Sequence, residues 1–257
     1  MENLPTEELR STFQSFVDIT LCAICLETVR PEMVQCVNGH LICSDCRGEL
    51  ETCPTCRDTF SNDKPSGIIT QIVEALPPRC RHKNCGRYIN RNDDDHQVYC
   101  GFRLTQCKFV DCEWNGCSHD ILQHVIDEHN EMLFEKESDV VTLNDFNVDE
   151  NISVVYAWYL HSQFFWHKIV NNAEKKQLIH SFVSVPIKKP ENKFYVKAVS
   201  TSKDMKFKVK IKLSLDPNVT TEDANYISIP KFMLPQFVDA ESNLTSHIAF
   251  KTGENRI

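Results

Sequence analysis

Eight cysteine and histidine residues near the start of the chain have the types and the spacing to bind metal ions. Read from Cys22, their pattern is C-x2-C-x10-C-x3-H-x2-C-x2-C-x6-C-x2-C. A C-x2-C pair lets two thiolates reach one ion, and a structural zinc site is closed by four sulfur or imidazole ligands. Eight ligands therefore predict two zinc sites, whose half-sites can pair serially or crosswise. The predicted ligands are Cys22, Cys25, Cys36, His40, Cys43, Cys46, Cys53 and Cys56.

Two further groups of four ligands follow, and each is sufficient for one more zinc ion. The first has the spacing C-x4-C-x10-H-x3-C and the second has C-x4-C-x11-H-x4-H. Apolar residues at helical spacing in DILQHVIDEHNEML place the two closing histidines near the end of a helix. This helix is acidic, which argues against a nucleic-acid-binding finger and favours a rigid spacer or a protein contact. The predicted ligands are Cys80, Cys85, His96, Cys100, Cys107, Cys112, His124 and His129.

The bulk composition limits the class of protein. A length of 257 residues allows two compact units, because domains usually have about 100 to 150 residues. The net charge of -8 opposes the positive field with which proteins hold nucleic acid. No cationic, apolar leader opens the sequence, and no apolar run approaches the roughly 18 residues that span a bilayer. We therefore expect no membrane partner and a cytoplasmic or also nuclear location, where disulfides are disfavoured and cysteine pairs bind metal.

The 13 cysteines all lie at or before Cys117, so the two ends of the chain use different means of stabilisation. Between the metal blocks, the apolar piece IITQIVEAL is predicted to form a short helix that two prolines terminate. The predicted parts are an acidic lead (1–20), a first metal module (21–60), a linker (61–79), a double finger (80–132) and a cysteine-free domain (133–257).

The cysteine-free part has the pattern of an all-β domain. In MKFKVKIKLSL, residues 205–215, apolar residues alternate with lysines, which predicts a strand with one solvated face. Its lysine row is interpreted as a solvated face that discourages edge-to-edge pairing, with an acidic partner as the alternative. ISVVYAWYL, LIHSFVSVPI, KFYVKAV and YISIP are further strand-like runs, and turn-forming residues separate them. The predicted fold class is small zinc-stabilised α+β modules followed by an antiparallel β-sandwich.

The order of the first eight ligands resembles the RING finger. This resemblance implies crosswise pairing, with Cys22, Cys25, Cys43 and Cys46 on one ion and Cys36, His40, Cys53 and Cys56 on the other. Crosswise pairing ties the ends of the module to its middle, so that metal binding supplies the free energy of folding.

RING ligases also present an apolar residue between the first two cysteines, another in the short helix after the sixth ligand, and a proline between the last two. Ile24, Leu50 and Pro54 hold these positions. Arg57 matches the family arginine that bridges the conjugating enzyme and its ubiquitin, a task that suits a planar five-donor group. In the alternative interpretation, Ile24 fills the small core, Pro54 shapes the turn, and Arg57 is a solvated charge. All four together in register favour the docking role.

A RING followed by this pair of fingers resembles the seven-in-absentia (Siah) family of ubiquitin ligases. The segment VQCVNGHLICSDCRGELETCPTCR is similar to the RING core of the family, and a C-x4-C-x-W stretch selects Cys112 as a ligand because Trp114 follows it. Cys117, His119 and His82 are then left as ordinary surface or core residues. DVVTLNDFN, residues 139–147, resembles the opening of the C-terminal domain of the family.

In that family, the C-terminal domain is a TRAF-like antiparallel sandwich that dimerises and takes up extended peptides from substrates. By our alignment, Val154 and Tyr156 stand where the groove edge of the family has a tryptophan and a methionine. The substrate-binding residues are therefore unknown.

The resemblance implies a ubiquitin-protein ligase with four structural zinc ions. Its implied partners are a ubiquitin-conjugating enzyme, ubiquitin, substrate peptides and a second copy of the chain, and the substrates are expected to be degraded by the proteasome. All the RING cysteines are predicted to bind zinc, so none carries ubiquitin covalently. The competing hypothesis is a catalytically inactive zinc-finger scaffold or decoy that dimerises with active relatives.

Overall fold

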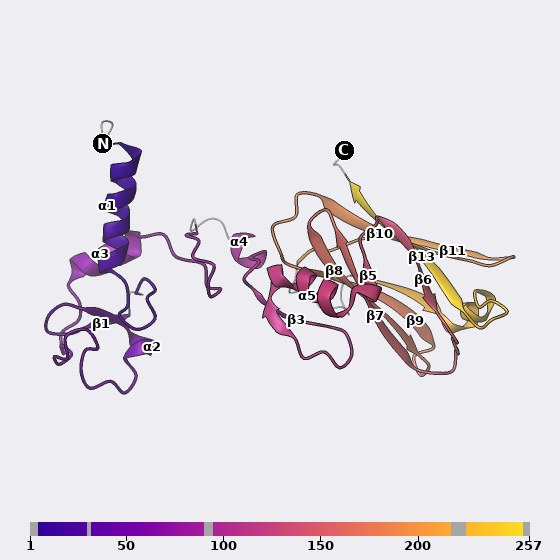
Figure 1. The fold of residues 1–257 in the computed structure, drawn as a ribbon, viewed down its shortest axis with the longest axis horizontal. Coiled ribbons are helices and arrows are strands. Elements are labelled where there is room, and N and C mark those ends of the chain that lie inside the picture. The colour runs from indigo at the N-terminus through magenta and orange to yellow at the C-terminus, as the bar shows by residue number, and fades with distance from the viewer. Residues whose placement is uncertain (1–4, 30–31, 90–94, 217–224, 254–257) are drawn as a thin grey trace. The chain divides into compact units, whose positions relative to one another are not determined.

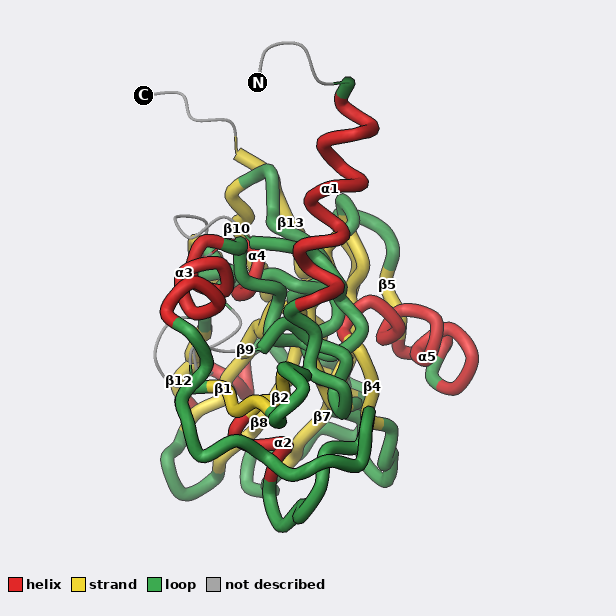
Figure 2. Tube along the Cα trace, turned by 90° about the vertical axis from the view of Figure 1, so that its left-hand side faces the viewer, coloured by secondary structure: helices red, strands yellow, loops and turns green. Residues whose placement is uncertain are grey.

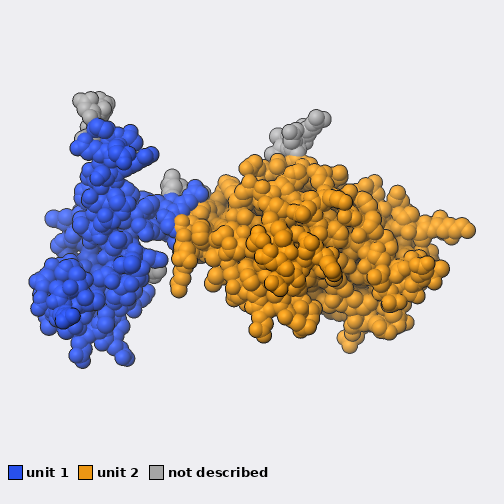
Figure 3. All heavy atoms as spheres, viewed as in Figure 1, with its two compact units in different colours: residues 1–80, 86–93 blue, residues 81–85, 94–257 orange. Residues whose placement is uncertain are grey.

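The computed structural model describes residues 5–29, 32–89, 95–216 and 225–253 (Figure 1). The chain divides into two compact units, one of residues 1–80 and 86–93 and the other of residues 81–85 and 94–257 (Figure 3). Each unit is described by itself below. Among the described residues, the helices are too short or too polar to cross a bilayer.

The first unit contains the first metal module. A small core of buried side chains joins its elements, and α3 contributes Val73 to this core, so the helix predicted in the linker packs with the RING. Ser66 caps α3 by accepting a hydrogen bond from the Ile69 backbone N–H at 3.4 Å. The elements are α1 Thr6–Ile19, β1 Met33–Gln35, β2 Leu41–Cys43, α2 Ser44–Arg47 and α3 Gly67–Ala75.

Helix α1 covers most of the segment predicted only as an acidic lead. Val17 in its last turn is its only buried residue, while Leu9, Phe13 and Phe16 are exposed. Glu7 and Glu8 lie in the first turn, where negative charge favours the helix dipole.

The second unit begins with finger elements and ends with a two-sheet sandwich. Helix α5 lies beside β5 and against the sheet of β7 and β8 (Figures 1 and 2). The finger elements are α4 Asp95–Val98, β3 Leu104–Gln106, β4 Asn115–Cys117, η1 Ser118–Asp120, α5 Ile121–Glu128 and η2 Asn130–Met132. The sandwich elements are β5 Leu133–Phe134, β6 Ser138–Leu143, β7 Ile152–Leu160, β8 Gln163–Asn172, β9 Gln177–Val185, β10 Lys193–Thr201, β11 Lys206–Lys212, β12 Tyr226–Pro230, η3 Lys231–Gln236 and β13 Leu244–Gly253.

The two sheets have the strand orders β11-β10-β13-β6 and β12-β9-β8-β7-β5. All their described pairings are antiparallel except that of β5 with β7, which is parallel. The inner faces enclose one large core, in which Trp158, Phe165 and Phe250 are buried. The predicted fold class of zinc modules followed by a β-sandwich is therefore confirmed.

Strands β8 and β13 were not predicted from the sequence. The β8 sequence QFFWHKIVNN lacks a clear alternation because both faces of this strand are covered. Phe165 points into the sandwich core, whereas Phe164 and Trp166 on the opposite face join a second core with residues of the finger. A strand covered on both faces has no need for alternating polar residues.

Candidate metal centres and docking face

The structure brings the predicted ligands together as four separate groups of four. Within each group, the candidate ligand atoms all lie within 4.8 Å of one another. The first two groups are paired crosswise, as the RING resemblance implies. The groups are Cys22, Cys25, Cys43 and Cys46; Cys36, His40, Cys53 and Cys56; Cys80, Cys85, His96 and Cys100; and Cys107, Cys112, His124 and His129.

The distances between ligand atoms test whether these groups fit zinc. In the RING, Cys25 Sγ lies 3.9 Å from Cys43 Sγ, and Cys36 Sγ lies 3.7 Å from Cys56 Sγ. A tetrahedron with zinc–sulfur bonds of about 2.3 Å has edges of about 3.8 Å. Sulfur–nitrogen edges are shorter, and Cys36 Sγ lies 3.4 Å from His40 Nδ1. The sulfur and imidazole donors and these spacings fit structural zinc.

Two of the three C-x2-C turns of the RING, those that begin at Cys22 and Cys53, share one backbone design. The N–H of the first cysteine donates to the carbonyl five residues later, from Cys22 to Glu27 and from Cys53 to Asp58, at 2.8 Å in both turns. The residue four positions after that cysteine has a left-handed backbone, with φ of 57° at Leu26 and 65° at Arg57. Each of these two residues also donates its N–H to the carbonyl of the first cysteine.

The longer C-x4-C turns of the fingers follow a related plan. Cys80 donates its N–H to Arg87 O at 2.8 Å, and Cys107 donates to Trp114 O at 3.1 Å. The residue four positions after the first cysteine is again left-handed, with φ of 67° at Asn84 and 61° at Asp111.

Backbone N–H groups also stabilise the thiolate of Cys22. Burial raises the pKa of this thiol, but N–H groups of Cys25, Cys43 and Ile24 oppose it and lower the pKa to about 7. A thiolate that is stable near neutral pH is the form that binds metal.

The four predicted docking residues are all exposed on the RING. Ile24 has 43% of its surface exposed and Leu50 has 36%, and Pro54 and Arg57 are also exposed. The predicted position of Leu50 in the short helix is wrong, because α2 ends at Arg47. Ile24 lies outside the RING core, so the alternative in which it fills that core is wrong. Leu26, which sequence reasoning did not single out, adds a further exposed apolar side chain at 67%.

Asn38 holds the turn that carries Arg57 and was also missed from the sequence. Its Nδ2 donates to Asp58 Oδ2 at 2.6 Å and contacts Cys56 Sγ at 3.4 Å. Asn38 thus contacts the residues on either side of Arg57 from a loop 20 residues upstream of Asp58. No short-range motif links these positions, so only the folded chain reveals the contact.

The second finger packs its ligands against aromatic rings. Trp114 stacks on His124 with ring centroids 4.6 Å apart, and Phe109 lies 4.4 Å from the ring of His129. Phe109 also makes an edge contact with Trp166 of β8 at 5.3 Å. The finger ligands are therefore supported by the outer face of the sandwich.

The structure places Cys112, and not Cys117, beside the closing histidines. Cys112 Sγ lies 3.4 Å from His124 Nε2. Cys117 instead lies near His119 and Asp120, which are both exposed. These three residues do not make up the four ligands of a structural zinc site. His82 contacts the backbone carbonyl of Gln97 at 3.0 Å, which is an ordinary structural role.

Val154 and Tyr156 lie on β7 and pack with the sandwich core. Tyr156 is only 8% exposed, and its hydroxyl donates to Thr142 O of β6 at 3.4 Å. Tyr156 is therefore part of the sandwich core, and the groove edge of the family cannot be assigned to this position.

Comparison with known proteins supports this architecture. The family model for the RING finger of the E3 ubiquitin-protein ligase sina/sinah matches residues 22–56. The chain is 29% identical over 161 residues to the E3 ubiquitin-protein ligase siah-1 of Caenorhabditis briggsae, which covers 61% of this chain and 36% of the relative. It is 25% identical over 177 residues to siah2 of Xenopus laevis (67% and 56%) and 25% over 175 residues to human SIAH2 (66% and 51%).

The aligned part thus spans about half or less of each of these relatives. It nevertheless extends well beyond the matched RING, which covers residues 22–56. The RING match, the paired ligand groups and the extended similarity show that the chain resembles the Siah/sina ubiquitin ligases.

Proposed function

We propose that this chain is a RING-type ubiquitin-protein ligase. The observation that carries the proposal is the exposure of Ile24, Leu50, Pro54 and Arg57 on a RING whose eight ligands are grouped crosswise. The apolar residues offer a docking surface for a ubiquitin-conjugating enzyme. Relatives named as E3 ubiquitin-protein ligases support the same activity.

The reaction requires no nucleophile on this chain. The RING cysteines all belong to ligand groups, so none is available to carry ubiquitin. Ubiquitin passes from the cysteine of the conjugating enzyme to a substrate lysine, as a thioester bond breaks and an amide bond forms. Arg57 donates hydrogen bonds to both the enzyme and its ubiquitin, which holds the thioester in an attack-ready geometry.

Zinc serves a structural role in this proposal. The four ligand groups would hold four ions, each with a closed set of protein ligands. The left-handed turn at Arg57 depends on the second RING group, because Cys53 and Cys56 both belong to that turn. Zinc in this group would therefore position the arginine.

The C-terminal sandwich is proposed to hold the substrate and to form a homodimer, and modified substrates are proposed to be degraded by the proteasome. A cytoplasmic or also nuclear location is part of the same proposal. Analytical ultracentrifugation tests the dimer separately from the activity. A monomer at micromolar concentration would remove the dimer from the proposal and leave the RING mechanism in place.

Self-ubiquitination with purified activating and conjugating enzymes tests the ligase activity. Wild type should build ubiquitin chains, Ile24→Ala should lose binding to the conjugating enzyme, and Arg57→Ala should bind it but discharge ubiquitin slowly. Arg10→Ala is the matched control, because Arg10 is an exposed arginine of α1 outside the RING. If wild type builds no chains with a broad panel of conjugating enzymes, the chain is a scaffold or decoy.

A further inference from the structure

Strand β11 presents a row of lysines along one face of the four-stranded sheet. Its lysines are exposed, while Phe207, Val209 and Ile211 between them pack against the sandwich core. In the described part of the chain, no ion pair involves these lysines. The row consists of Lys206, Lys208, Lys210 and Lys212.

The positive charge continues onto the neighbouring strands. Lys197 of β10 is paired in register with Lys210, and Tyr195 of β10 is paired with both Lys212 and Lys251 of β13. Residues directly opposite each other in a sheet point to the same face. Lys251 is also the ion-pair partner of Glu137, with 3.9 Å between Nζ and Oε2, so its charge is partly balanced. Protection of an exposed sheet edge would require lysines on β11 alone. A basic face that extends from β11 onto β10, in a chain of net charge -8, instead indicates a complementary acidic partner.

The outer edge of β11 carries backbone groups that no other strand of the sheet pairs with among the described residues. β11 is the terminal strand in the order β11-β10-β13-β6, and no described strand pairs with its outer edge. Leu213 N–H donates to Phe194 O at 2.9 Å, just beyond the paired strands. Because narrow and wide pairs alternate in an antiparallel ladder, Phe207, Val209 and Ile211 bond to β10. The lysines between them therefore direct their backbone N–H and C=O groups outward.

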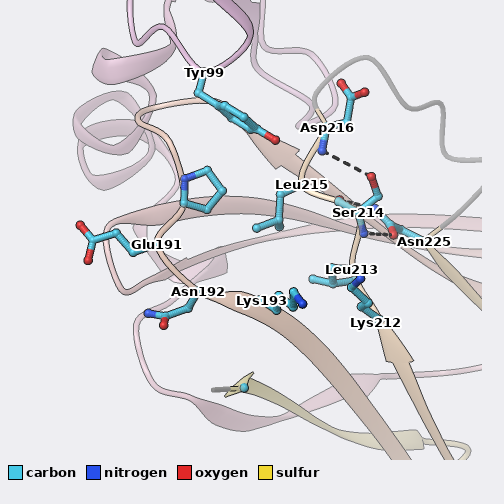
Figure 4. Close-up of a pocket in the computed structure, with 12 residues that line it drawn as sticks. Tyr99, Glu191, Asn192, Lys193, Lys212, Leu213, Ser214, Leu215, Asp216 and Asn225 are labelled. Carbon is cyan, nitrogen blue, oxygen red and sulfur yellow. Dashed lines mark hydrogen bonds between the residues drawn. The ribbon is translucent and has the colours of Figure 1, made fainter. Parts of the chain in front are cut away.

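The open edge has a defined end. Asn225 donates from Nδ2 to Ser214 O at 2.8 Å and accepts from Ser214 N–H at 2.7 Å (Figure 4). This pair of bonds occupies the backbone just after β11. It lies beside a hollow of about 750 Å³ whose lining includes Lys193 and Lys212. The edge available to another strand thus runs along the seven residues of β11.

We propose that β11 binds an acidic, extended segment of a partner protein as an additional antiparallel strand. Acidic residues at every second position of that segment face the lysine row, and their backbone groups bond to the outward groups of the lysines. A nucleic-acid strand fits this face less well, because stacking requires open aromatic rings. The ring of Tyr195 is already covered by Lys210 Nζ, 4.5 Å from its centroid. The proposal does not depend on ligase activity.

Fluorescence anisotropy with the zinc-loaded full chain tests the proposal. The probe is a labelled, end-capped peptide in which four glutamates alternate with three threonines. The first control is a peptide of the same composition with the glutamates in one block. Methylation of the glutamate amides should abolish binding, whereas methylation of the threonine amides, which face away from β11, should leave it intact. Equal binding of the block peptide, or of the glutamate-methylated peptide, would overturn the proposal.

Charge reversal on the protein provides the second arm. The double variant Lys208→Glu/Lys210→Glu should lower the affinity for the probe peptide by at least about tenfold. The matched control is Lys175→Glu/Lys176→Glu, which changes the charge equally at exposed positions between β8 and β9 and should retain wild-type affinity. If the β11 variant does not fold, Lys208→Gln/Lys210→Gln replaces it. Tighter binding of a thymidine oligonucleotide than of the peptide would assign the face to nucleic acid and overturn the proposal.

Discussion

His167 Nε2 lies 3.0 Å from His180 Nδ1 at the centre of the β-sandwich. Both rings are fully buried, and His167 stacks on Phe182 with ring centroids 4.5 Å apart. The other ring nitrogens, His167 Nδ1 and His180 Nε2, have no hydrogen-bond partner among the described residues. One neutral imidazole must donate to the other, so this core holds two uncharged histidines.

The histidine pair should make the free energy of unfolding fall in acid. Burial lowers the pKa of His180 to about 4. Burial also lowers the pKa of His167 well below its ordinary value, and repulsion from a protonated His180 lowers it further. The unfolded chain takes up protons below pH about 6.5 and the folded chain does not, so stability decreases as pH falls from about 7 to about 4. His180 alone should account for a loss on the order of 3 kcal/mol.

Urea unfolding at several pH values, followed by tryptophan fluorescence, measures this loss. The double variant His167→Phe/His180→Leu removes both titrating groups and should show a weaker pH dependence than wild type. His161→Ala, which removes an exposed histidine, is the control and should keep the wild-type dependence. Identical pH profiles for the double variant and wild type would rule out the histidine pair as the cause.

Replacement of Cys112 should remove one zinc ion, and replacement of Cys117 should not. Cys112 lies beside the finger ligand His124, whereas Cys117 belongs to no group of four ligands among the residues that the structure describes. Metal analysis should give four zinc ions per chain for wild type and Cys117→Ser, and three for Cys112→Ser. The reverse result would assign Cys117 as the ligand.

Asn38→Ala should slow ubiquitin discharge without loss of zinc. The variant removes the hydrogen bond to Asp58 and the contact with Cys56, so the turn that carries Arg57 becomes less constrained. We expect the rate of single-turnover discharge from a conjugating enzyme to fall about tenfold. This is the effect expected if the less constrained Arg57 makes one hydrogen bond fewer in the transition state. Asn62→Ala, at an exposed position after the RING, should discharge at the wild-type rate. Unchanged discharge by Asn38→Ala would show that Arg57 is positioned without this contact.

Gly116→Ala should destabilise the second finger. A Cβ atom at this position would lie 2.6 Å from Trp114 Cζ2, and Trp114 stacks on the ligand His124. We expect a loss of about 1 to 3 kcal/mol in thermal unfolding, typical of overpacking. Gly67→Ala is the control, since a Cβ there meets nothing within 4 Å. Equal stability of both variants would mean that Trp114 moves aside without cost.

Some strands were predictable and others were not, for a reason visible in their surroundings. The run ISVVYAWYL coincides with β7, and the lysine-alternating run contains β11. β11 has one solvated face and so keeps its alternation, whereas β8 is covered by the core on one face and by the finger on the other. The sequence signal of a strand depends on how many of its faces meet water.

The sequence alone determined the ligand groups, the RING resemblance and the order of zinc modules before sandwich. Zinc ligation demands specific residue types at short intervals, and such a signal is local in the chain. The tertiary structure alone decided that Phe109 meets Trp166, that Asn38 holds the turn of Arg57, that α3 joins the RING core, and that the lysine backbone faces outward. These features arise from contacts between residues distant in sequence, and burial of apolar surface selects such partners by shape and not by spacing.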